Sequence, residues 1–556
     1  MASPSTLEVE RKYDVDDAVV FPSLSGLAGV SAVDHPVEHH LSAEYFDTPD
    51  LRLASLRITL RRRTGGYDAG WHLNFPSGPD ARLEFHAPFG PGSGGSAAHD
   101  GGPQGDPDVG GPHEAVRKGT PEAVPEALLG LIRVHVRDAA LVPVARLHTR
   151  RTIRRLHGPD GGALADAVDD HVRAETLVLE HAERRWREWE IELTGGTRGL
   201  LDVVQGAFLA AGARPSSSAS KLERALGPHF PTGHTTPPVP RRKGAAGDVL
   251  LAYLGEQVRS LVEQDPLVRE DAPDAVHKMR VATRRMRSTL ATFRELLDGD
   301  AANRLRGELQ WLAGVLGAAR DTEVMHARLR KMLASEPDTL VMGPVAHRVD
   351  LELDAAYRDA HNAVLRALDG ERYFRLLDAL DAILVDPPFT SLAHKPALKV
   401  VSRVVTHDAR RLRRAVRAWK VPAPPMEGPL GAAPQEAAPQ AAGPLEGADA
   451  ADAALHEARK CAKRLRYAAE AAVPVGGKRA ARLAEAAKGV QTVLGEHQDS
   501  VVTRGLLERL GAVAGAEGED GFTYGRLHAL EEGLASNAVA SFRTQWKDFP
   551  SASLKK

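Results

Sequence analysis

The chain has 556 residues, 43% of them hydrophobic, which allows roughly two to four domains with cores of their own and excludes a chain that is disordered throughout. Its formal net charge is only −2, and a single cysteine, Cys461, excludes an intramolecular disulfide and is typical of a reducing cytoplasm. There is no run of about 18 apolar residues and no apolar segment near the amino terminus, so we expect a cytoplasmic protein without a transmembrane helix, a secretory signal or a membrane partner.

The first 226 residues are predicted to form a domain rich in strands. Hydrophobic and polar residues alternate with period two, as in half-buried strands, over residues 7–13, 56–62, 70–75 and 186–193. Residues 88–125, crowded with Gly, Pro and Asp, are predicted to be a flexible insertion within this domain. Residues 200–211 are predicted to form a short helix.

Carboxylates alternate along two of these strands. Period two places Glu8, Glu10 and Lys12 on one face of the first strand. The same pattern recurs in the last strand at Glu188, Glu190 and Glu192. A solvated outer face is the ordinary explanation for one such strand. Two of them favour a metal site, because facing like charges are unfavourable unless a cation lies between them, and carboxylate oxygens suit such a cation.

Basic residues in the same domain suggest a phosphate-binding wall opposite these carboxylates. They are Arg61, Arg63, Arg82, Arg146, Arg151 and Lys221. A cavity with carboxylates on one wall and guanidinium groups on the other suits a metal–triphosphate complex, because arginine binds phosphate oxygens bidentately and the metal ion bridges carboxylates to phosphate.

An ordered set of motifs resembles the CYTH family of triphosphate tunnel metalloenzymes, which includes thiamine triphosphatases, inorganic triphosphatases and class IV adenylyl cyclases. The set comprises Glu8-x-Glu10-x-Lys12, Tyr45-Phe46-Asp47-Thr48-Pro49, Leu60-Arg61-Arg62-Arg63, Trp71-His72-Leu73, Arg151, Asp169-Asp170, Glu188 to Glu192 and Ser220-Lys221-Leu222, within residues 5–225. The resemblance implies a closed antiparallel β-barrel that forms a tunnel.

The resemblance also implies roles for individual residues. Glu8 and Glu10 would bind Mg²⁺ or Mn²⁺, with Glu190 and Glu192 opposite. Either Asp169 or Asp170 takes the family's aspartate position, and Glu188 is an alternative to Glu192. Lys12 would position phosphate or the attacking water, and phosphate would be bound by Arg61, Arg63, Arg151 and Lys221. One residue departs from the family: Asn74 stands where a lysine is usual, so one phosphate-binding charge is missing.

The second half of the chain is predicted to be helical. Residues 227–247 form a predicted linker, and residues 248–546 are dominated by Ala, Leu, Arg and Glu with apolar residues at helical spacing. Residues 421–452, rich in Ala, Pro and Gly, are predicted to be a disordered low-complexity segment that divides this half in two.

The two helical pieces repeat each other. Residues 277–287 match residues 456–466, and a Leu-Gly-x-x-x-Asp element ends at Asp321 in the first piece and at Asp499 in the second. We therefore expect two similar helical bundles that face each other. Asp321 and Asp499 are either metal ligands or, as we favour, helix caps or partners of a nearby arginine.

Both copies carry a basic helical face. On a helix over residues 276–293, basic side chains share one arc while Met279, Ala282, Met286, Leu290 and Phe293 lie opposite. The basic residues of the two copies are His277, Arg280, Arg284, Arg285, Arg287, His456, Arg459, Lys460, Lys463, Arg464 and Arg466. A solvated face is the ordinary explanation, but no acid lies within residues 277–287, and the arrangement recurs. Both facts favour a polyanionic ligand.

These basic segments resemble the CHAD family, the conserved histidine α-helical domain, and the resemblance covers about residues 248–546. It implies two pseudo-symmetric helical bundles that bind inorganic polyphosphate. Nucleic acid is not expected, because base stacking needs aromatic residues and only Tyr467 accompanies the basic segments. Cys461 aligns with Ala282 on the apolar side, so we interpret it as a core residue.

The overall prediction is an α+β multidomain protein with an N-terminal β-barrel tunnel and duplicated helical bundles. Its expected function is polyphosphate binding combined with metal-dependent hydrolysis of triphosphate or a related short phosphate chain, and association with polyphosphate granules is compatible with it. The alternative is a non-catalytic polyphosphate-binding protein with a degenerate tunnel, which Asn74 supports. Nucleotide cyclisation would need an adenine pocket, of which the sequence gives no sign.

Overall fold

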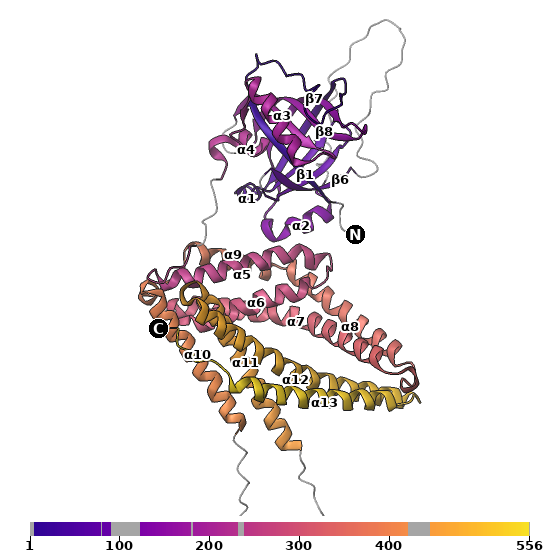
Figure 1. Ribbon diagram of the computed structural model, residues 1–556, viewed down its shortest axis with the longest axis vertical. Coiled ribbons are helices and arrows are strands. Elements are labelled where there is room, and N and C mark those ends of the chain that lie inside the picture. Colours follow the sequence, from indigo (N-terminus) through magenta and orange to yellow (C-terminus); the bar gives the residue numbers. More distant parts are fainter. Residues whose placement is uncertain are drawn as a thin grey trace, which may run out of the picture. The chain divides into compact units, whose positions relative to one another are not determined.

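The computed structural model describes residues 5–78, 80–89, 123–178, 182–231, 238–420 and 445–554, without the side chains of 420 and 445–450. The chain forms two compact units, Met1–His234 and Thr235–Lys556 (Figure 1). The boundary between them falls within residues 227–247, the predicted linker. Most of the predicted insertion, residues 90–122, lies outside the described part of the chain.

The first unit is a closed antiparallel barrel, as predicted, and the barrel has eight strands. In order around the barrel the strands are β1 (Ser5–Val15), β6 (Ala81–Pro88), β5 (Gly70–Pro76), β4 (Thr59–Thr64), β3 (Val37–Asp47), β7 (Val142–His157), β8 (Ala163–Thr176) and β9 (Glu183–Leu193), which pairs again with β1. Two short strands lie at its margin, β2 (Ala32–Val33) on β7 and β10 (Arg214–Pro215) on β1.

One predicted strand begins later than expected. The prediction over residues 56–62 is wrong for its first three residues, because the helix α1 (Arg52–Ser55) runs directly into a turn. Arg57 has a φ of 60° in that turn, a conformation that no strand residue adopts, so β4 starts only at Thr59.

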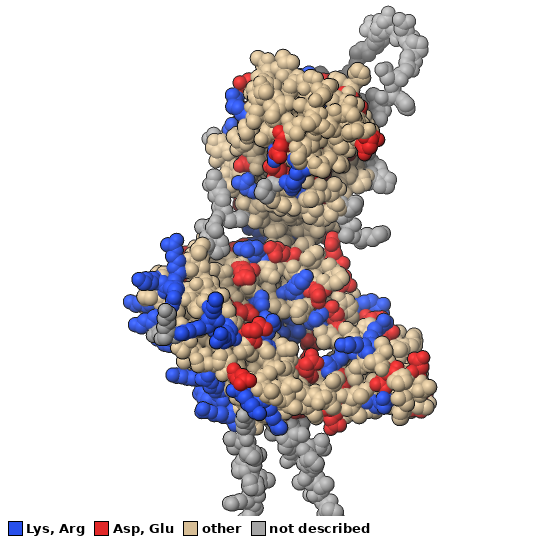
Figure 2. Space-filling model, viewed as in Figure 1, with Lys and Arg blue, Asp and Glu red and all other residues tan. Residues whose placement is uncertain are grey.

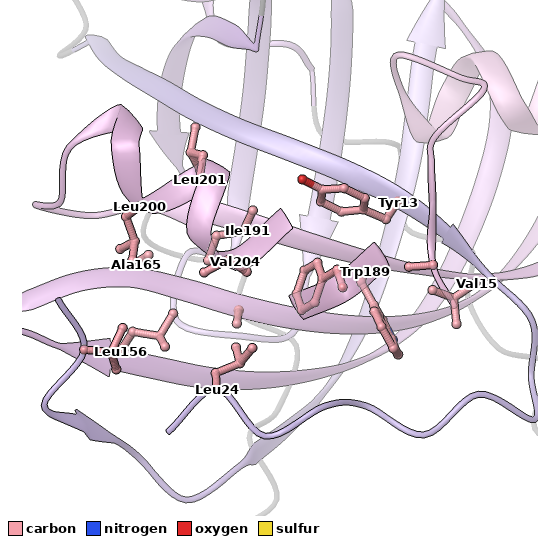
Figure 3. Close-up of a cluster of buried hydrophobic side chains, with 14 residues drawn as sticks. Tyr13, Val15, Leu24, Leu156, Ala165, Trp189, Ile191, Leu200, Leu201 and Val204 are labelled. Atoms are coloured by element: carbon pink, nitrogen blue, oxygen red, sulfur yellow. The ribbon is translucent and has the colours of Figure 1, made fainter. Parts of the chain in front are cut away.

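The outer face of the barrel is apolar and is covered by helices. Tyr13 and Val15 of β1 and Trp189 of β9 pack with Leu201 and Val204 of α3 (Arg198–Ala210) (Figure 3). On another side α2 (Glu126–Val136) covers an outward-facing cluster from β4 and β5. Because side chains alternate along each strand, the carboxylates of β1 and β9 point into the barrel.

A short helix seals apolar surface at one end of the barrel interior. The helix α4 (Lys221–Leu226) packs its Leu222 and Leu226 against Leu147 and Val172, which point inward from β7 and β8. Ser220 caps the helix by accepting a hydrogen bond from the backbone N–H of Glu223, at 3.0 Å. The 3₁₀ helix η1 (Gly227–His229) follows it.

The second unit is helical. Its α-helices are α5 (Ala246–Arg269), α6 (Ala275–Thr292), α7 (Gly299–Ser335), α8 (Val345–Leu368), α9 (Glu371–Val385), α10 (Ala397–Lys420), α11 (Leu445–Gly476), α12 (Lys478–Ala516) and α13 (Phe522–Lys547). Three 3₁₀ helices lie between them, η2 (Arg294–Leu296), η3 (Asp338–Leu340) and η4 (Ser391–His394). Within the described residues, no helix is long and apolar enough to cross a membrane.

The predicted duplication is visible in the packing. Helices α5–α8 recur as α10–α13, with α6 against α11 and α5 against α10. The first turns of α5 and α10 exchange backbone hydrogen bonds: the Ala246 N–H donates to the Lys395 carbonyl at 3.0 Å, and the Ala397 N–H donates to the Gly244 carbonyl at 2.8 Å. The predicted apolar face of α6 is buried.

The predicted low-complexity segment is shorter than residues 421–452. Helix α11 begins at Leu445, so residues 445–452 are helical and the prediction is wrong for them. The physical reason is local: Pro444 is the last proline of the segment, and the residues after it are mainly helix formers. Residues 421–444 lie outside the described part of the chain.

Candidate functional sites in the barrel and the helical unit

The barrel encloses a polar cavity of about 90 Å³. Its lining comes from several strands and from the start of α4: Glu8, Glu10, Lys12, Tyr45, Thr59, Arg61, Arg63, Asp68, Asn74, Arg82, Arg151, Glu190, Glu192, Ser220 and Lys221. Strand register explains why these residues meet, because Glu8 lies opposite Arg82, Lys12 opposite Glu190 and Arg151 opposite Asp170. Carboxylates and basic groups therefore share one interior.

Some of the carboxylates are already paired with cations. Asp170, Glu188 and Glu190 lie close enough together to hold a metal ion. However, the Lys221 ammonium contacts all three of them, Glu188 at 2.5 Å, Glu190 at 2.7 Å and Asp170 at 3.0 Å. Arg151 binds Asp170 bidentately at 2.6 and 2.9 Å. Despite burial, Lys12 and Lys221 hold the pKa of Glu190 well below its usual range.

Other carboxylates lack such partners. Within the described part of the chain, Glu8 and Glu192 form no ion pair, although Glu10 is bound by Lys12 at 2.8 Å and by Arg82 at 3.2 Å. Burial, a hydrogen bond with Glu84 and repulsion from Glu84 and Glu192 raise the pKa of Glu8 to about 9. Burial and repulsion from Glu10 raise the pKa of Glu192 to about 7.

This carboxylate set fits a divalent cation. Buried carboxylates that repel one another are stabilised in the ionised form when a cation lies among them. Hard oxygen ligands are those that Mg²⁺ and Mn²⁺ prefer. Asp170, Glu188 and Glu190 are already neutralised by Lys12, Arg151 and Lys221. The residues better placed to hold a metal ion are therefore Glu8 and Glu192, and Glu10 lies opposite Glu192 in the strand register.

On the basic wall of the cavity, the charge of Arg63 is poorly compensated. Arg63 is buried, and burial together with the neighbouring Arg61 and Arg151 lowers its pKa to about 9. Asp68, which is half exposed, contacts Arg63. Three guanidinium groups close enough to lower a pKa are stabilised when an anion lies between them. A phosphate chain has the charge and the acceptor geometry for this position.

The helical unit contains a larger basic site, a groove between the two repeats. It comprises adjoining cavities of about 1050 Å³ and 640 Å³ that share lining residues, including Arg284, Arg287, Lys460 and Lys463. The predicted basic residues that line them are His277, Arg280, Arg284, Arg285, Arg287, His456, Arg459, Lys460, Lys463, Arg464 and Arg466. The two predicted basic faces are therefore one continuous surface.

The two repeats build this groove with equivalent contacts. Arg280 of α6 lies 3.1 Å from Asp321 of α7, and Arg459 of α11 lies 3.9 Å from Asp499 of α12. Both aspartates thus pair with an arginine, as we favoured. The glycines of the Leu-Gly-x-x-x-Asp elements lie under these guanidinium groups: a Cβ on Gly317 would be 3.4 Å from Arg280, and one on Gly495 would be 3.5 Å from Arg459.

The basic residues of the groove divide into two groups. Within the described residues, Arg284, Arg287 and Lys463 form no ion pair or hydrogen bond through their side chains. The others contact neighbouring groups of the protein. Arg464 donates to Asp408, Thr292 and the Ala291 carbonyl. Glu470 lies 3.5 Å from Arg285 and 2.7 Å from Arg466, and Glu457 lies 3.8 Å from Lys460. The first group is available to a ligand.

Comparison with known proteins assigns each of the two units to a domain family. The CYTH domain model matches residues 6–226 and the CHAD domain model matches residues 252–508. An uncharacterized protein of Mycobacterium tuberculosis is 40% identical over 544 residues, which cover 95% of this chain and 93% of the relative. The chain belongs to the CYTH–CHAD family. Its N-terminal domain has the triphosphate tunnel fold.

Solved structures also resemble the chain. PptA from Streptomyces chartreusis is 25% identical, with a TM-score of 0.42, and the match covers 55% of this chain and all of PptA. The CHAD domain of the plant Ricinus communis is 23% identical, with a TM-score of 0.42, and the match covers 57% of this chain and 99% of the plant domain.

Two residues predicted for the CYTH tunnel lie outside it. Arg146 is on the outer surface, 2.9 Å from Glu44 and 3.8 Å from Glu175, because it is one strand position out of phase with Arg151. Asp169 also points outward, where Arg187 binds it at 2.7 and 2.8 Å and the Trp189 indole donates to it at 3.1 Å. Asp170 is thus the aspartate inside the tunnel.

The CYTH tunnel also contains a carboxylate that the sequence analysis missed. Glu84 accepts hydrogen bonds from Asn74 at 3.3 Å and Arg61 at 3.4 Å, and lies 3.0 Å from the His72 Nδ1. The alternation Arg82-x-Glu84 on β6 was the available signal. Asn74, which replaces the family's lysine, is buried, and its side-chain oxygen has no hydrogen-bond partner within the described residues.

The histidines that give the CHAD domain its name line the groove. Burial and the nearby Arg320 lower the pKa of His277, while the Nδ1 of His456 lies 2.6 Å from the Gln498 Oε1. Arg320, Arg306 and Arg328 add to the lining and were not predicted. Cys461 is buried, and burial raises the pKa of its thiol, in agreement with a core role.

Proposed function

We propose that the protein binds inorganic polyphosphate in the CHAD groove and hydrolyses triphosphate, or a related short phosphate chain, in the CYTH tunnel with Mg²⁺ or Mn²⁺. One observation carries the enzymatic part. The tunnel holds two carboxylates that form no ion pair within the described residues, Glu8 and Glu192. Beside them lies the buried guanidinium group of Arg63, whose pKa is lowered by burial and by the neighbouring Arg61 and Arg151. A metal–triphosphate complex supplies both missing charges at once.

The residues of the tunnel would have separate roles in metal binding, phosphate binding and positioning. A divalent cation bound by Glu8, Glu10 and Glu192 would neutralise phosphate charge and lower the pKa of water. Arg61, Arg63 and Arg151 would hold the phosphate oxygens and stabilise the charge that spreads over them during phosphoryl transfer. Lys12, between Glu10 and Glu190, would orient phosphate or the attacking water. Lys221 would fix the neighbouring carboxylates in place.

The CHAD groove supports the binding part. Its unpaired cations come from both repeats, so a single flexible polyanion can contact all of them. Polyphosphate fits better than nucleic acid because Tyr467 is the one Phe, Tyr or Trp among the groove lining residues, and it is buried with Arg285 and Arg466 over its ring. Such binding would bring the protein to polyphosphate granules.

A phosphate-release screen tests the enzymatic part. Purified full-length protein is incubated with inorganic triphosphate, longer polyphosphate, ATP or thiamine triphosphate, each with Mg²⁺, Mn²⁺ or EDTA. We expect metal-dependent release from triphosphate, and loss of that release in the Glu8→Gln/Glu10→Gln variant. Wild-type turnover by the double variant at saturating Mg²⁺ would show that the tunnel is not the active site.

A second candidate function is polyphosphate binding without catalysis. Asn74 favours it, because the substitution removes a cation from the tunnel while Glu84 remains. If no substrate in the screen releases phosphate but triphosphate raises the melting temperature of the protein in Mg²⁺, the tunnel binds without hydrolysing.

A further inference from the structure

Helix α10 carries a row of basic side chains outside the groove. Lys399, Arg403, Arg410, Arg414 and Arg417 are all exposed. At 100° per residue they fall within one narrow stripe of the helix, and they span about 27 Å along its axis at 1.5 Å per residue. Figure 2 shows Lys and Arg side chains gathered over the edge of the helical unit where Figure 1 labels α10. We call these five residues the α10 stripe.

The opposite side of α10 packs against the helical bundle. Val401, Val405, Leu412 and Val416 are buried there. The single acid of the helix, Asp408, is also buried, where it contacts Arg464 and Thr292. The helix therefore has no apolar surface left to insert into a lipid bilayer, and no acid of its own to balance the stripe.

The α10 stripe is poorly neutralised by its surroundings. Arg403 lies 2.7 Å from Glu295, but both side chains are about 60% exposed, so this ion pair is weak. Within the described part of the chain, the remaining four residues form no ion pair. Like charges three and four residues apart, such as Arg410, Arg414 and Arg417, destabilise an isolated helix, which makes a bound anion favourable.

The duplicated architecture does not require this stripe. In the first repeat α5 occupies the place of α10, and its exposed charges are mixed in sign, among them Glu256, Arg259 and Glu263. Both helices pack their apolar faces in the same manner, so the stripe on α10 is not a consequence of packing. It is a property of the second repeat alone.

One flank of α10, beside the stripe, approaches the rim of the groove. Arg411, next to Arg410, lies 4.0 Å from Glu457 of α11. The same glutamate lies 3.8 Å from Lys460, which lines the groove. Cations on the surface of α10 and cations in the groove are thus separated by one exposed carboxylate.

We propose that the α10 stripe binds the part of a long polyphosphate chain that extends beyond the groove. The inference rests on the proposed function of the groove and adds a second contact surface to it. An unbranched phosphate chain suits a linear row of cations that offers no exposed aromatic ring, since the nearby Trp419 packs against Phe542 and Arg543. The protein would then discriminate chains by length, because only long chains reach both surfaces.

A four-residue variant of the full-length protein tests this proposal. Arg403, Arg410, Arg414 and Arg417 are changed to Gln, which keeps a good helix former at each position. The matched control changes Arg259, Arg358, Arg366 and Arg482, which are exposed on other helices, to Gln. Binding of a short and of a long polyphosphate is measured in metal-free buffer at several salt concentrations, with circular dichroism and thermal melting to verify folding.

We expect the stripe variant to lose about tenfold or more in affinity for long polyphosphate while its affinity for short polyphosphate stays unchanged. The slope of log affinity against log salt for the long chain should fall by roughly 2 to 3, because four phosphate contacts are removed. The control should match wild type with both chains.

Three outcomes would overturn the proposal. If the stripe variant and the control behave alike with the long chain, the stripe makes no contact. If the stripe variant instead loses affinity for single-stranded RNA or for anionic vesicles but keeps its affinity for long polyphosphate, the stripe binds that other partner. If wild-type protein binds neither polyphosphate, the proposed function of the groove fails, and the extension fails with it.

Discussion

At the scale of single residues, the tunnel is defined by charges that lack partners. Most buried ionisable groups of the barrel are paired, as the contacts of Lys221 and Arg151 show. The exceptions are Glu8 and Glu192, which form no ion pair within the described residues, and Arg63, whose ionic contact is the half-exposed Asp68. Burial and like-charged neighbours displace the pKa values of these three groups toward the neutral form. Unpaired buried charges cost stability, so their presence indicates a ligand that supplies the missing charge.

This cost predicts the behaviour of the Glu8→Gln variant. The pKa of Glu8 is raised from 4.5 to about 9 in the folded protein, so the metal-free protein loses stability as the pH rises from 4.5 toward 9. Glutamine does not titrate. In EDTA at pH 8 the variant should therefore be more stable than wild type, by on the order of 1–3 kcal/mol, and near pH 4.5 the difference should vanish.

Thermal melting across this pH range measures the effect, with Glu256→Gln on the exposed surface of α5 as the control. Mg²⁺ should raise the melting temperature of wild type and leave that of Glu8→Gln nearly unchanged. A wild type that is the more stable protein in EDTA at pH 8 would contradict our account of Glu8.

A second residue-scale prediction concerns Asn74. Lysine at this position would restore the cation that is usual in the family and would face Glu84. If the missing cation limits turnover, Asn74→Lys should raise kcat/KM for triphosphate by about tenfold, which corresponds to 1.36 kcal/mol of transition-state stabilisation. Asn74→Gln serves as a control that changes size without charge. Equal kcat/KM values for the three proteins would show that Asn74 does not limit the reaction.

At the scale of elements, the groove depends on paired helices. In each repeat a glycine on the second helix leaves room for an arginine from the first, and an aspartate one turn later binds that arginine. The same three-residue arrangement joins α6 to α7 and α11 to α12. It fixes how each basic helix presents its cations, and it explains why the motifs recur together.

This arrangement predicts the effect of removing the aspartates. In the Asp321→Asn/Asp499→Asn variant, Arg280 and Arg459 lose their anionic partners, and the groove gains two positive charges. Affinity for polyphosphate should rise several-fold, and more steeply at low salt. Titrations in EDTA and in Mg²⁺ should show the same gain. A loss of affinity that appears only in Mg²⁺ would indicate that the aspartates are metal ligands instead.

Elements with strong periodicity could be predicted from the sequence, and those set by local geometry could not. The alternation of Glu8, Glu10 and Lys12 and the helical spacing around Met279 and Met286 both reflect burial, which the fold then realises. By contrast, Arg146 was misplaced because one residue of strand phase decides whether a side chain faces the tunnel or the solvent. Among the described residues, Arg284 and Lys463 lack ionic partners because of neighbours that are distant in sequence, so the sequence could not predict which cations are unpaired.

At the scale of the whole molecule, the chain forms two compact units, and each contains one of the two candidate sites. The tunnel is small and enclosed, which suits the end of a chain or a short chain. The groove is open and more than ten times larger, which suits the body of a long one. Under the proposed function, a single protein would hold a polymer in one unit and hydrolyse a short phosphate chain in the other.

The most direct test of this account is a titration of the helical unit by itself with long-chain polyphosphate. The fragment from Thr235 to the carboxyl terminus should bind without the CYTH domain, and the affinity should fall steeply with salt. Replacing Arg284, Arg287 and Lys463 with Gln should remove most of the affinity, because these cations from both repeats contact one chain. Single-stranded RNA of equal charge should bind more weakly; equal or tighter binding of RNA, or full affinity in the triple variant, would contradict the account.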